Sequence, residues 1–278
     1  MLTWLQNSFQ ENSILWLLLS SILGGIIGAS MRFVFEVILP QQLQQRQQVI
    51  AAKRRYATPI LLAAEDLRRR LENIIRHIQN VEREDWLSGQ DPTGYFFLST
   101  LYVVGQFFGW LQILRRTVVY LDFTTTRETR KYERFLDAIE IGFSDPGLFG
   151  IVQTSYPSQT QDQWVFTFHL QAIGTAMIIR DGDENRTLDF ASFHKKFTEN
   201  IHSEVNTWFS PLVRLFEGLT ADDPRFHRLV AIHAILNAFI EYVDANHLRT
   251  ESSRYHWDLL SAEEAESIRQ KIYKITKM

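Results

Sequence analysis

Hydrophobic positions near the N-terminus form one continuous run, whereas further along the chain they alternate with polar residues. No charged residue occurs from Ile14 to Met31, and apolar residues continue past Arg32. These 18 residues would span roughly 27 Å as a helix, close to the hydrocarbon thickness of a bilayer. The pattern predicts a transmembrane helix over residues 14–39, preceded by a short extracytoplasmic segment, residues 1–13.

A cleaved signal peptide is the alternative interpretation of this run. The residues before it contain no Lys or Arg and include Glu11, so the basic region that opens a signal peptide is missing. The stretch Gly28 to Arg32 does not form a convincing cleavage site. The sequence therefore favours a retained membrane anchor.

Basic residues near the predicted span lie on its C-terminal side. The positive-inside rule therefore predicts a cell-membrane protein that crosses once, with residues 41–278 in the cytoplasm. The same side chains are expected to contact lipid headgroups, and Arg32 and Glu36 are spaced to pair on one helix face. The basic residues are Arg32, Arg46, Lys53, Arg54 and Arg55.

Small residues recur every four positions within the predicted span. Such ladders allow a second helix to approach closely, so we expect the span to self-associate or to pack on a partner span. The alternative is that these residues have no interface, because Gly is common in membrane helices. The ladders are Ser20, Gly24 and Gly28, and Ser21, Gly25 and Ala29.

A glutamine-rich stretch after the span predicts a helical stalk over residues 40–58. Thr58 and Pro59 then resemble an N-cap followed by proline in the first turn, which predicts that a domain helix begins there, within a domain over residues 59–278. Apolar residues in that helix follow heptad spacing, which allows a coiled coil. The apolar stripe is wider than a two-residue seam, however, and this favours packing within a globular domain.

Acidic residues flank the basic cluster Arg68–Arg70 on the same predicted helix. Glu65, Asp66 and Glu72 are spaced to form pairs within the helix. We therefore expect this cluster to occupy a solvated helix face and not a site for lipid or nucleic acid.

A second uncharged run, from Pro92 to Leu114, is also long enough to cross a bilayer. It is rich in aromatic residues, is interrupted by polar side chains, and has many Lys and Arg residues on both sides. These features oppose a membrane crossing and favour a buried central helix in which Gly105 and Gly109 permit close packing. A second span over residues 95–114 remains the alternative.

The remaining pattern predicts a mostly α-helical domain with a minor β element. Residues 164–170 alternate between apolar and polar positions, which is typical of a strand. Ser210 with Pro211, and Asp223 with Pro224, are start signals for two helices, the second running to about Asn246. Ser261 and Glu264 form a capping box for a last helix.

Composition excludes several classes of function. The chain has 29 Lys and Arg against 32 Asp and Glu, so it offers no general attraction to nucleic acid. It has no Cys, which excludes disulfides, thiolate metal sites and cysteine nucleophiles.

One polar strip on the helix after Asp223 is the best candidate for chemistry. Helical spacing places His233, Asn237, Glu241 and Asp244 on one side of an otherwise apolar element. A histidine near carboxylates could perform acid–base catalysis or bind a metal ion. The alternative, which we favour at this point, is that the strip is the wet face of the helix, so no catalytic residue, metal site or cofactor is assigned.

The stretch from Asp181 to Asp189 resembles the start of a calcium-binding loop. Its oxygen-bearing side chains have the right spacing, but Arg186 replaces the glycine and Ser192 the glutamate that such loops need. We therefore predict a polar connecting loop here.

Several phrases of the sequence resemble those of an uncharacterised group of predicted bacterial membrane-associated proteins. They include Arg55-Tyr56 with Pro59-Ile60-Leu61, the stretch from Gly109 to Arg116, and Gln171-Ala172-Ile173-Gly174. The resemblance covers most of the predicted cytoplasmic part, and it implies membrane association but no activity.

Together these patterns predict a single-pass membrane protein whose α-rich cytoplasmic domain works as an interaction or scaffolding module with an unidentified protein partner. Two alternatives stay open. One is a two-span subunit of a membrane complex, with residues 95–114 in lipid. The other is a membrane-tethered enzyme that uses the polar strip.

Overall fold

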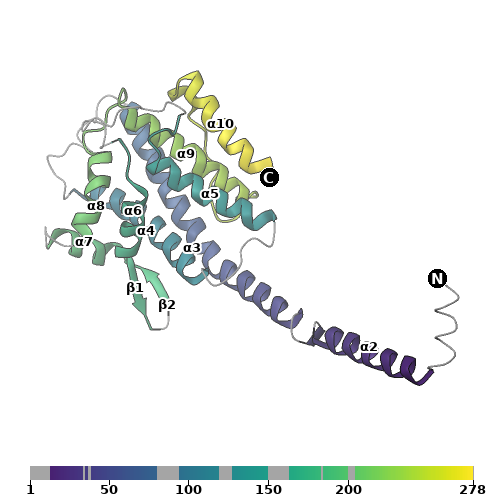
Figure 1. Cartoon of the computed structure of the whole chain (residues 1–278). Coiled ribbons are helices and arrows are strands. Elements are labelled where there is room, and N and C mark those ends of the chain that lie inside the picture. Colours follow the sequence, from purple (N-terminus) through teal and green to yellow (C-terminus); the bar gives the residue numbers. More distant parts are fainter. Residues whose placement is uncertain are drawn as a thin grey trace. The chain divides into compact units, whose positions relative to one another are not determined.

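The structure, a computed structural model, describes residues 13–33, 35–36, 39–79, 94–118, 127–149, 163–182, 184–199 and 204–277. The chain divides into two units, residues 1–51 and residues 52–278. The described residues are mostly helical with two short strands, which confirms the prediction of a mostly α-helical protein with a minor β element (Figure 1). The predicted extracytoplasmic segment, before residue 13, lies outside the described residues.

The first unit contains helix α2, Ser13–Phe33. From Ser20 onward its side chains are exposed, and Ile26 keeps 59% of its surface accessible. Within the described residues, a Cβ atom added at Gly24 or Gly28 would meet no heavy atom within 4 Å. Within the first unit, the large apolar side chains described on this helix are therefore exposed and not packed in a core.

Helix α3 is continuous from Leu39 to Gln79, so the predicted helix start at Thr58 and Pro59 is wrong. Pro59 lies inside the helix, where proline costs a backbone hydrogen bond. Burial of the following apolar stripe compensates, because Ile60 and Leu67 are fully buried in the core of the second unit. The interpretation of this stripe as packing within a globular domain is confirmed.

Helix α4, Tyr95–Val118, is the central element of the second unit. Among the described residues, the segment long and apolar enough to cross a membrane is Tyr95–Thr117, and 78% of its most apolar window is buried in the domain. A Cβ atom at Gly105 or Gly109 would collide with Phe209 or Thr187. The prediction that these glycines allow close packing is confirmed.

Several short elements cover one side of α4. They are helices α6 (Thr167–Ala176), α7 (Phe190–Thr198) and α8 (Glu204–Phe216), and strands β1 (Ile178–Asp181) and β2 (Glu184–Thr187). Gly174 on α6 lies against the backbone carbonyl of Phe108, so the two helices approach at backbone distance. Only a residue without a Cβ atom fits that crossing.

A second group of helices packs together in the same unit, although the first of them is distant from the other two in the sequence. Helix α9, Pro224–Val243, lies between α5, Arg127–Ser144, and α10, Ala262–Lys277 (Figure 1). The buried guanidinium of Arg228 donates to the carbonyls of Gly142 and Asp145, at 2.7 and 2.9 Å. This contact fixes the end of α5 on α9.

The strand predicted over residues 164–170 is wrong, although a minor β element exists nearby. Residues from Thr167 onward form α6, in which Leu170 and Ile173 are buried while Phe168 is 82% exposed. Helical packing on α4 therefore overrides the local alternation. The actual strands are β1 and β2, which pair antiparallel, and Gly182 supplies the left-handed turn at φ 61°. Because β2 lies inside the stretch that resembled a calcium loop, the prediction of a polar connecting loop there is wrong for residues 184–187.

Of the three helix starts predicted after residue 200, those at Asp223 and Ser261 are confirmed and the one at Ser210 and Pro211 is wrong. Asp223 caps α9 by accepting from the Arg225 N–H at 2.8 Å, and Ser261 with Glu264 forms the predicted capping box of α10. Pro211, however, lies inside α8. It leaves the Thr207 carbonyl without its usual helical donor, and the Ser210 hydroxyl donates to that oxygen at 3.0 Å.

Candidate functional site: a buried glutamate and two histidines

The predicted polar strip does not form the wet face of α9, because the helix is buried from Arg228 to Ile240. Its four members instead have separate surroundings. Asn237 Nδ2 donates to the Arg254 carbonyl at 3.3 Å, and Glu241, at the exposed end, accepts from the Tyr255 hydroxyl at 2.8 Å. The strip is therefore not a single catalytic surface.

Asp244 follows the last turn of α9 and organises the next loop. Its carboxylate accepts from the N–H groups of Leu248, Arg249 and Thr250 at 2.9–3.0 Å, and from the Thr250 hydroxyl at 2.9 Å. These bonds hold the pKa of Asp244 below its usual range, with the Arg249 N–H contributing most. Asp244 thus shapes the loop and has no direct part in a site at His233.

His233 meets two residues that sequence analysis did not connect with it. Glu72 comes from α3 and His256 from the segment just before the short helix η5, Trp257–Leu259. Glu72 Oε2 lies 2.9 Å from His233 Nε2 and 3.0 Å from His256 Nε2. One ligand atom from each residue lies within 4.8 Å of the other two, and all three residues are buried.

The imidazole of His233 has unusual surroundings for a buried polar ring. Its exposed fraction is 0%, and among the described residues neither Nδ1 nor Nε2 has a hydrogen-bond partner. Nε2 is close to the Glu72 carboxylate, but it does not satisfy hydrogen-bond geometry. Burial lowers the pKa of His233 despite the nearby carboxylate. The ring is therefore neutral near pH 7, and one of its nitrogens carries a free lone pair.

Glu72 is held in place from its other side. Arg76 Nε donates to Oε1 at 2.8 Å, and the Ser253 hydroxyl donates to Oε2 at 3.2 Å. Burial raises the pKa of Glu72, but the two adjacent imidazoles outweigh burial and hold that pKa well below its usual range. Glu72 is thus an ionised carboxylate aimed at two imidazoles. The prediction of a solvated helix face for Glu72 is wrong.

The loop that carries His256 is anchored on both helices of the site. Asn237 on α9 holds the Arg254 carbonyl, and Glu65 on α3 accepts from the Glu251 N–H at 3.4 Å. Glu65 also pairs with buried Arg68 at 2.7 Å, which confirms a predicted pair within the helix but places it in the core. The segment before η5 is therefore pre-positioned over Glu72 and His233.

Two imidazole nitrogens and one carboxylate oxygen form a ligand set typical of Zn²⁺ and other divalent transition metal ions. Sequence analysis missed it because Glu72, His233 and His256 are separated by long stretches of chain. One signal was available. An ionisable residue in the middle of an apolar helix, as His233 is, needs a partner because burial without one is costly.

The residues predicted to contact lipid or a partner helix lie mostly in the first unit. The ladder residues from Ser20 to Ala29 lie on exposed parts of α2. The Arg32 guanidinium pairs with Glu36 at 2.9 Å, which the four-residue spacing allowed although contact with lipid headgroups was favoured. Arg55, in the second unit, forms an ion pair with Glu184 on β2. The side chains of Arg46, Lys53 and Arg54 lie outside the described residues.

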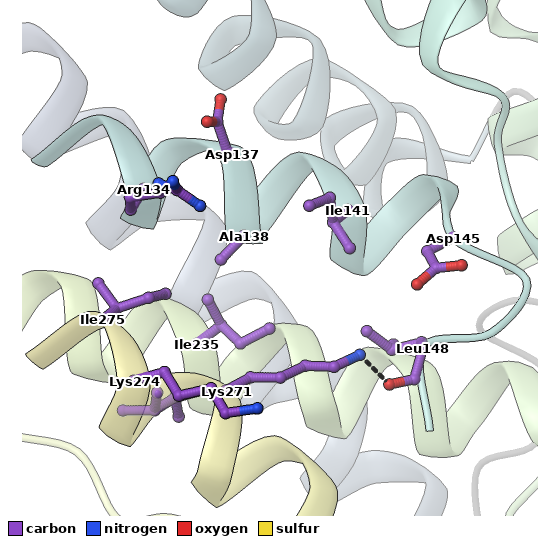
Figure 2. Close-up of a pocket in the computed structure, with 11 residues that line it drawn as sticks. Arg134, Asp137, Ala138, Ile141, Asp145, Leu148, Ile235, Lys271, Lys274 and Ile275 are labelled. Atoms are coloured by element: carbon purple, nitrogen blue, oxygen red, sulfur yellow. Dashed lines mark hydrogen bonds between the residues drawn. The ribbon is translucent and has the colours of Figure 1, made fainter. Parts of the chain in front are cut away.

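A groove of about 360 Å³ lies between α5, α9 and α10 (Figure 2). Its floor includes Ile235 and Ile275, and the ammonium of Lys271 donates to the Leu148 carbonyl across one end. Burial lowers the pKa of Lys271. The groove also exposes Ile141, and its lining combines an apolar floor with cationic groups and with two carboxylates, those of Asp137 and Asp145. The further cationic lining residues are Arg134 and Lys274.

Comparison of the chain with known protein families, with curated proteins and with solved structures gives no match. The similarity to a group of membrane-associated proteins therefore stays a prediction. What the sites do must be inferred from their geometry and chemistry.

Proposed function

We propose that the chain is a single-pass protein of the cell membrane, anchored by α2, whose helical domain lies in the cytoplasm and works as an interaction or scaffolding module. The observation that carries the proposal is the contrast between two apolar helices. α4 buries its apolar surface inside the domain, whereas α2 leaves large apolar side chains such as Ile22 and Phe33 exposed. An exposed apolar helix of 21 residues needs lipid or a partner.

The orientation follows from charge. Basic residues close to α2 lie on its C-terminal side, which supports a cytoplasmic location for the domain. If α4 crossed the membrane, it would lose its contacts with α6 and β2. Its departure would leave a cavity in the core of the domain and expose that cavity to solvent. The single-pass arrangement keeps the whole domain on one side of the membrane.

Because the chain has no cysteine, single-cysteine variants test the orientation directly. The full chain would carry Ser8→Cys, Gln79→Cys or Ser252→Cys, and intact cells would be treated with a membrane-impermeant maleimide. We expect labelling at position 8 alone, with positions 79 and 252 labelled only after the membrane is permeabilised.

Each other outcome has a defined meaning. Labelling of intact cells at position 252 but not at position 79 would show that α4 crosses the membrane and would overturn the single-pass arrangement. Labelling of intact cells at positions 79 and 252, but not at position 8, would show that the orientation is the reverse of the one proposed. Release of the full chain from isolated membranes by alkaline carbonate would refute anchoring.

The groove of Figure 2 is the surface where we expect a protein partner. Its apolar floor suits an apolar segment, and its three cationic residues against two carboxylates favour acidic residues on that segment. A photo-crosslinking amino acid at Ile141, which is exposed in the groove, should yield an adduct in cells. The matched control is Leu248, which is exposed and apolar but outside the groove. Equal adducts at both positions, or none at Ile141, would refute this surface.

The ladders on α2 add a second part to the proposal, self-association within the membrane. Replacing Gly28 by Leu would put a bulky side chain on the small face, so the dimer signal of the full chain in a membrane two-hybrid assay should fall. Ile22→Leu is the control, because it keeps the size and polarity of that position. An unchanged signal in the Gly28→Leu variant would argue against the ladder.

A further inference from the structure

We propose that Glu72, His233 and His256 bind one Zn²⁺ ion, which joins α3, α9 and the loop before η5. The site is independent of the membrane anchor and of the groove. It adds an inorganic ligand to a protein for which the sequence predicted none.

The donor set and its spacing fit the ion. Zinc accepts imidazole nitrogen and carboxylate oxygen in tetrahedral sites, and at bond lengths of about 2.0–2.1 Å neighbouring ligand atoms lie roughly 3.3 Å apart. Here the carboxylate oxygen lies 2.9 and 3.0 Å from the two imidazole nitrogens. Small side-chain movements would therefore create the coordination distances. A water molecule would complete the tetrahedron.

The orphaned ring of His233 is an independent observation that points to a ligand. A buried polar group without a partner costs about 1–3 kcal/mol, and native structures rarely keep one. Both nitrogens of this fully buried ring lack a hydrogen-bond partner among the described residues, although a carboxylate lies 2.9 Å away. A ring nitrogen that lies close to a carboxylate oxygen without donating a hydrogen bond to it is placed to bind a cation together with that oxygen.

The surroundings of Glu72 match those of a metal-binding carboxylate. Its Oε1 accepts from Arg76, and its Oε2, which also accepts from the Ser253 hydroxyl, is directed at both imidazoles. Groups that orient a ligand in this way are typical of metal sites. Asn237 and Asp244 act one step further out, because they hold the loop that delivers His256.

The competing explanation is a metal-free network in which Glu72 accepts hydrogen bonds from both histidines. The two explanations differ in measurable ways. A network needs no ion and is unaffected by chelators. A zinc site binds one equivalent of Zn²⁺, and it gives Co²⁺ the visible absorption of a tetrahedral nitrogen and oxygen environment.

The test uses the full chain in detergent micelles, purified without a polyhistidine tag, treated with a chelator and then titrated with ZnCl₂ by calorimetry. We expect one site per chain, and a higher midpoint of thermal unfolding when Zn²⁺ is present. X-ray absorption of the zinc-loaded protein should show two imidazole ligands. Absence of stoichiometric binding, or a signal from one imidazole or none, would overturn the proposal.

Variants identify the ligands. Glu72→Gln and His256→Asn should each weaken Zn²⁺ binding by at least about tenfold and remove the thermal shift. The matched control is His247→Asn, because His247 lies in the same loop, outside the cluster, at a positive φ that asparagine tolerates. Wild-type affinity in the Glu72 and His256 variants would overturn the assignment. If a ligand variant does not fold, the absorption spectrum of the wild-type protein still decides.

Discussion

Helices α2 and α4 have 21 and 24 residues and uncharged stretches of similar length, yet the two helices differ in how much of their apolar surface is buried. α4 is buried by α6, α8 and the β-hairpin, and glycines at its crossings permit backbone contact. α2 exposes its apolar side chains. The comparison teaches that length and apolarity do not distinguish a buried helix from an exposed one, because the difference lies in whether neighbouring elements supply a complementary surface.

The strongest test of this comparison removes one large side chain from each helix. Phe107→Ala on α4 should lower the free energy of unfolding of the domain by about 3–5 kcal/mol, because it leaves a cavity in a close-packed core. Phe33→Ala on α2 should leave that free energy unchanged. Urea unfolding of the full chain, followed by near-ultraviolet circular dichroism, measures both. Equal effects would break the comparison.

Ion pairs provide the next test. Glu65 and Arg68 form a pair in the core, whereas Arg32 and Glu36 form one with side chains 76% and 60% exposed. Glu65→Gln should cost about 3 kcal/mol, because it leaves a buried guanidinium without its counter-charge. Glu36→Gln should cost less than about 0.5 kcal/mol. The same urea titration measures both, and a small effect at Glu65 would mean that water reaches Arg68.

Glycine crossings should give a smaller difference. Gly174→Ala should destabilise the domain by about 1–3 kcal/mol, because the new Cβ atom would collide with the Phe108 carbonyl. Gly24→Ala has open space around it in the described structure and should leave the stability of the domain unchanged. Thermal unfolding of the two variants, compared with that of the wild type, gives the result. Tolerance of alanine at Gly174 would show that α6 can move away from α4.

The smallest expected effect is a pH dependence. Burial raises the pKa of Glu65, but hydrogen bonds from Arg68 and Arg69 outweigh it, so the folded pKa is lowered. The resulting stability is present above the unfolded value of about 4.3 and is lost as pH falls below it. Melting temperatures between pH 6 and pH 3 should therefore decline less in Glu65→Gln than in the wild type. Glu36→Gln should keep the wild-type profile, because Glu36 is exposed and belongs to the first unit, not to the domain whose melting is followed. Parallel profiles in Glu65→Gln and the wild type would contradict the expectation.

Local signals in the sequence predicted some elements well. The capping residues Asp223 and Ser261 start α9 and α10, and the apolar stripe after Pro59 faces the core. Proline was a poorer guide. Pro59 and Pro211 lie inside helices because packing of the flanking residues and a serine hydroxyl offset the lost backbone bond. The alternation at residues 164–170 failed for a related reason, since a neighbouring helix offered better packing than a strand partner.

The sequence by itself determined that the protein is mostly helical, that residues 14–31 form an uncharged apolar run, and where two helices begin. These properties depend on neighbouring residues. Only the tertiary structure decided that α4 is a core helix, and only it placed Glu72, His233 and His256 around one point. Such convergence depends on how distant segments pack, because a side chain's partners are set by the crossing of elements and not by its position along the chain.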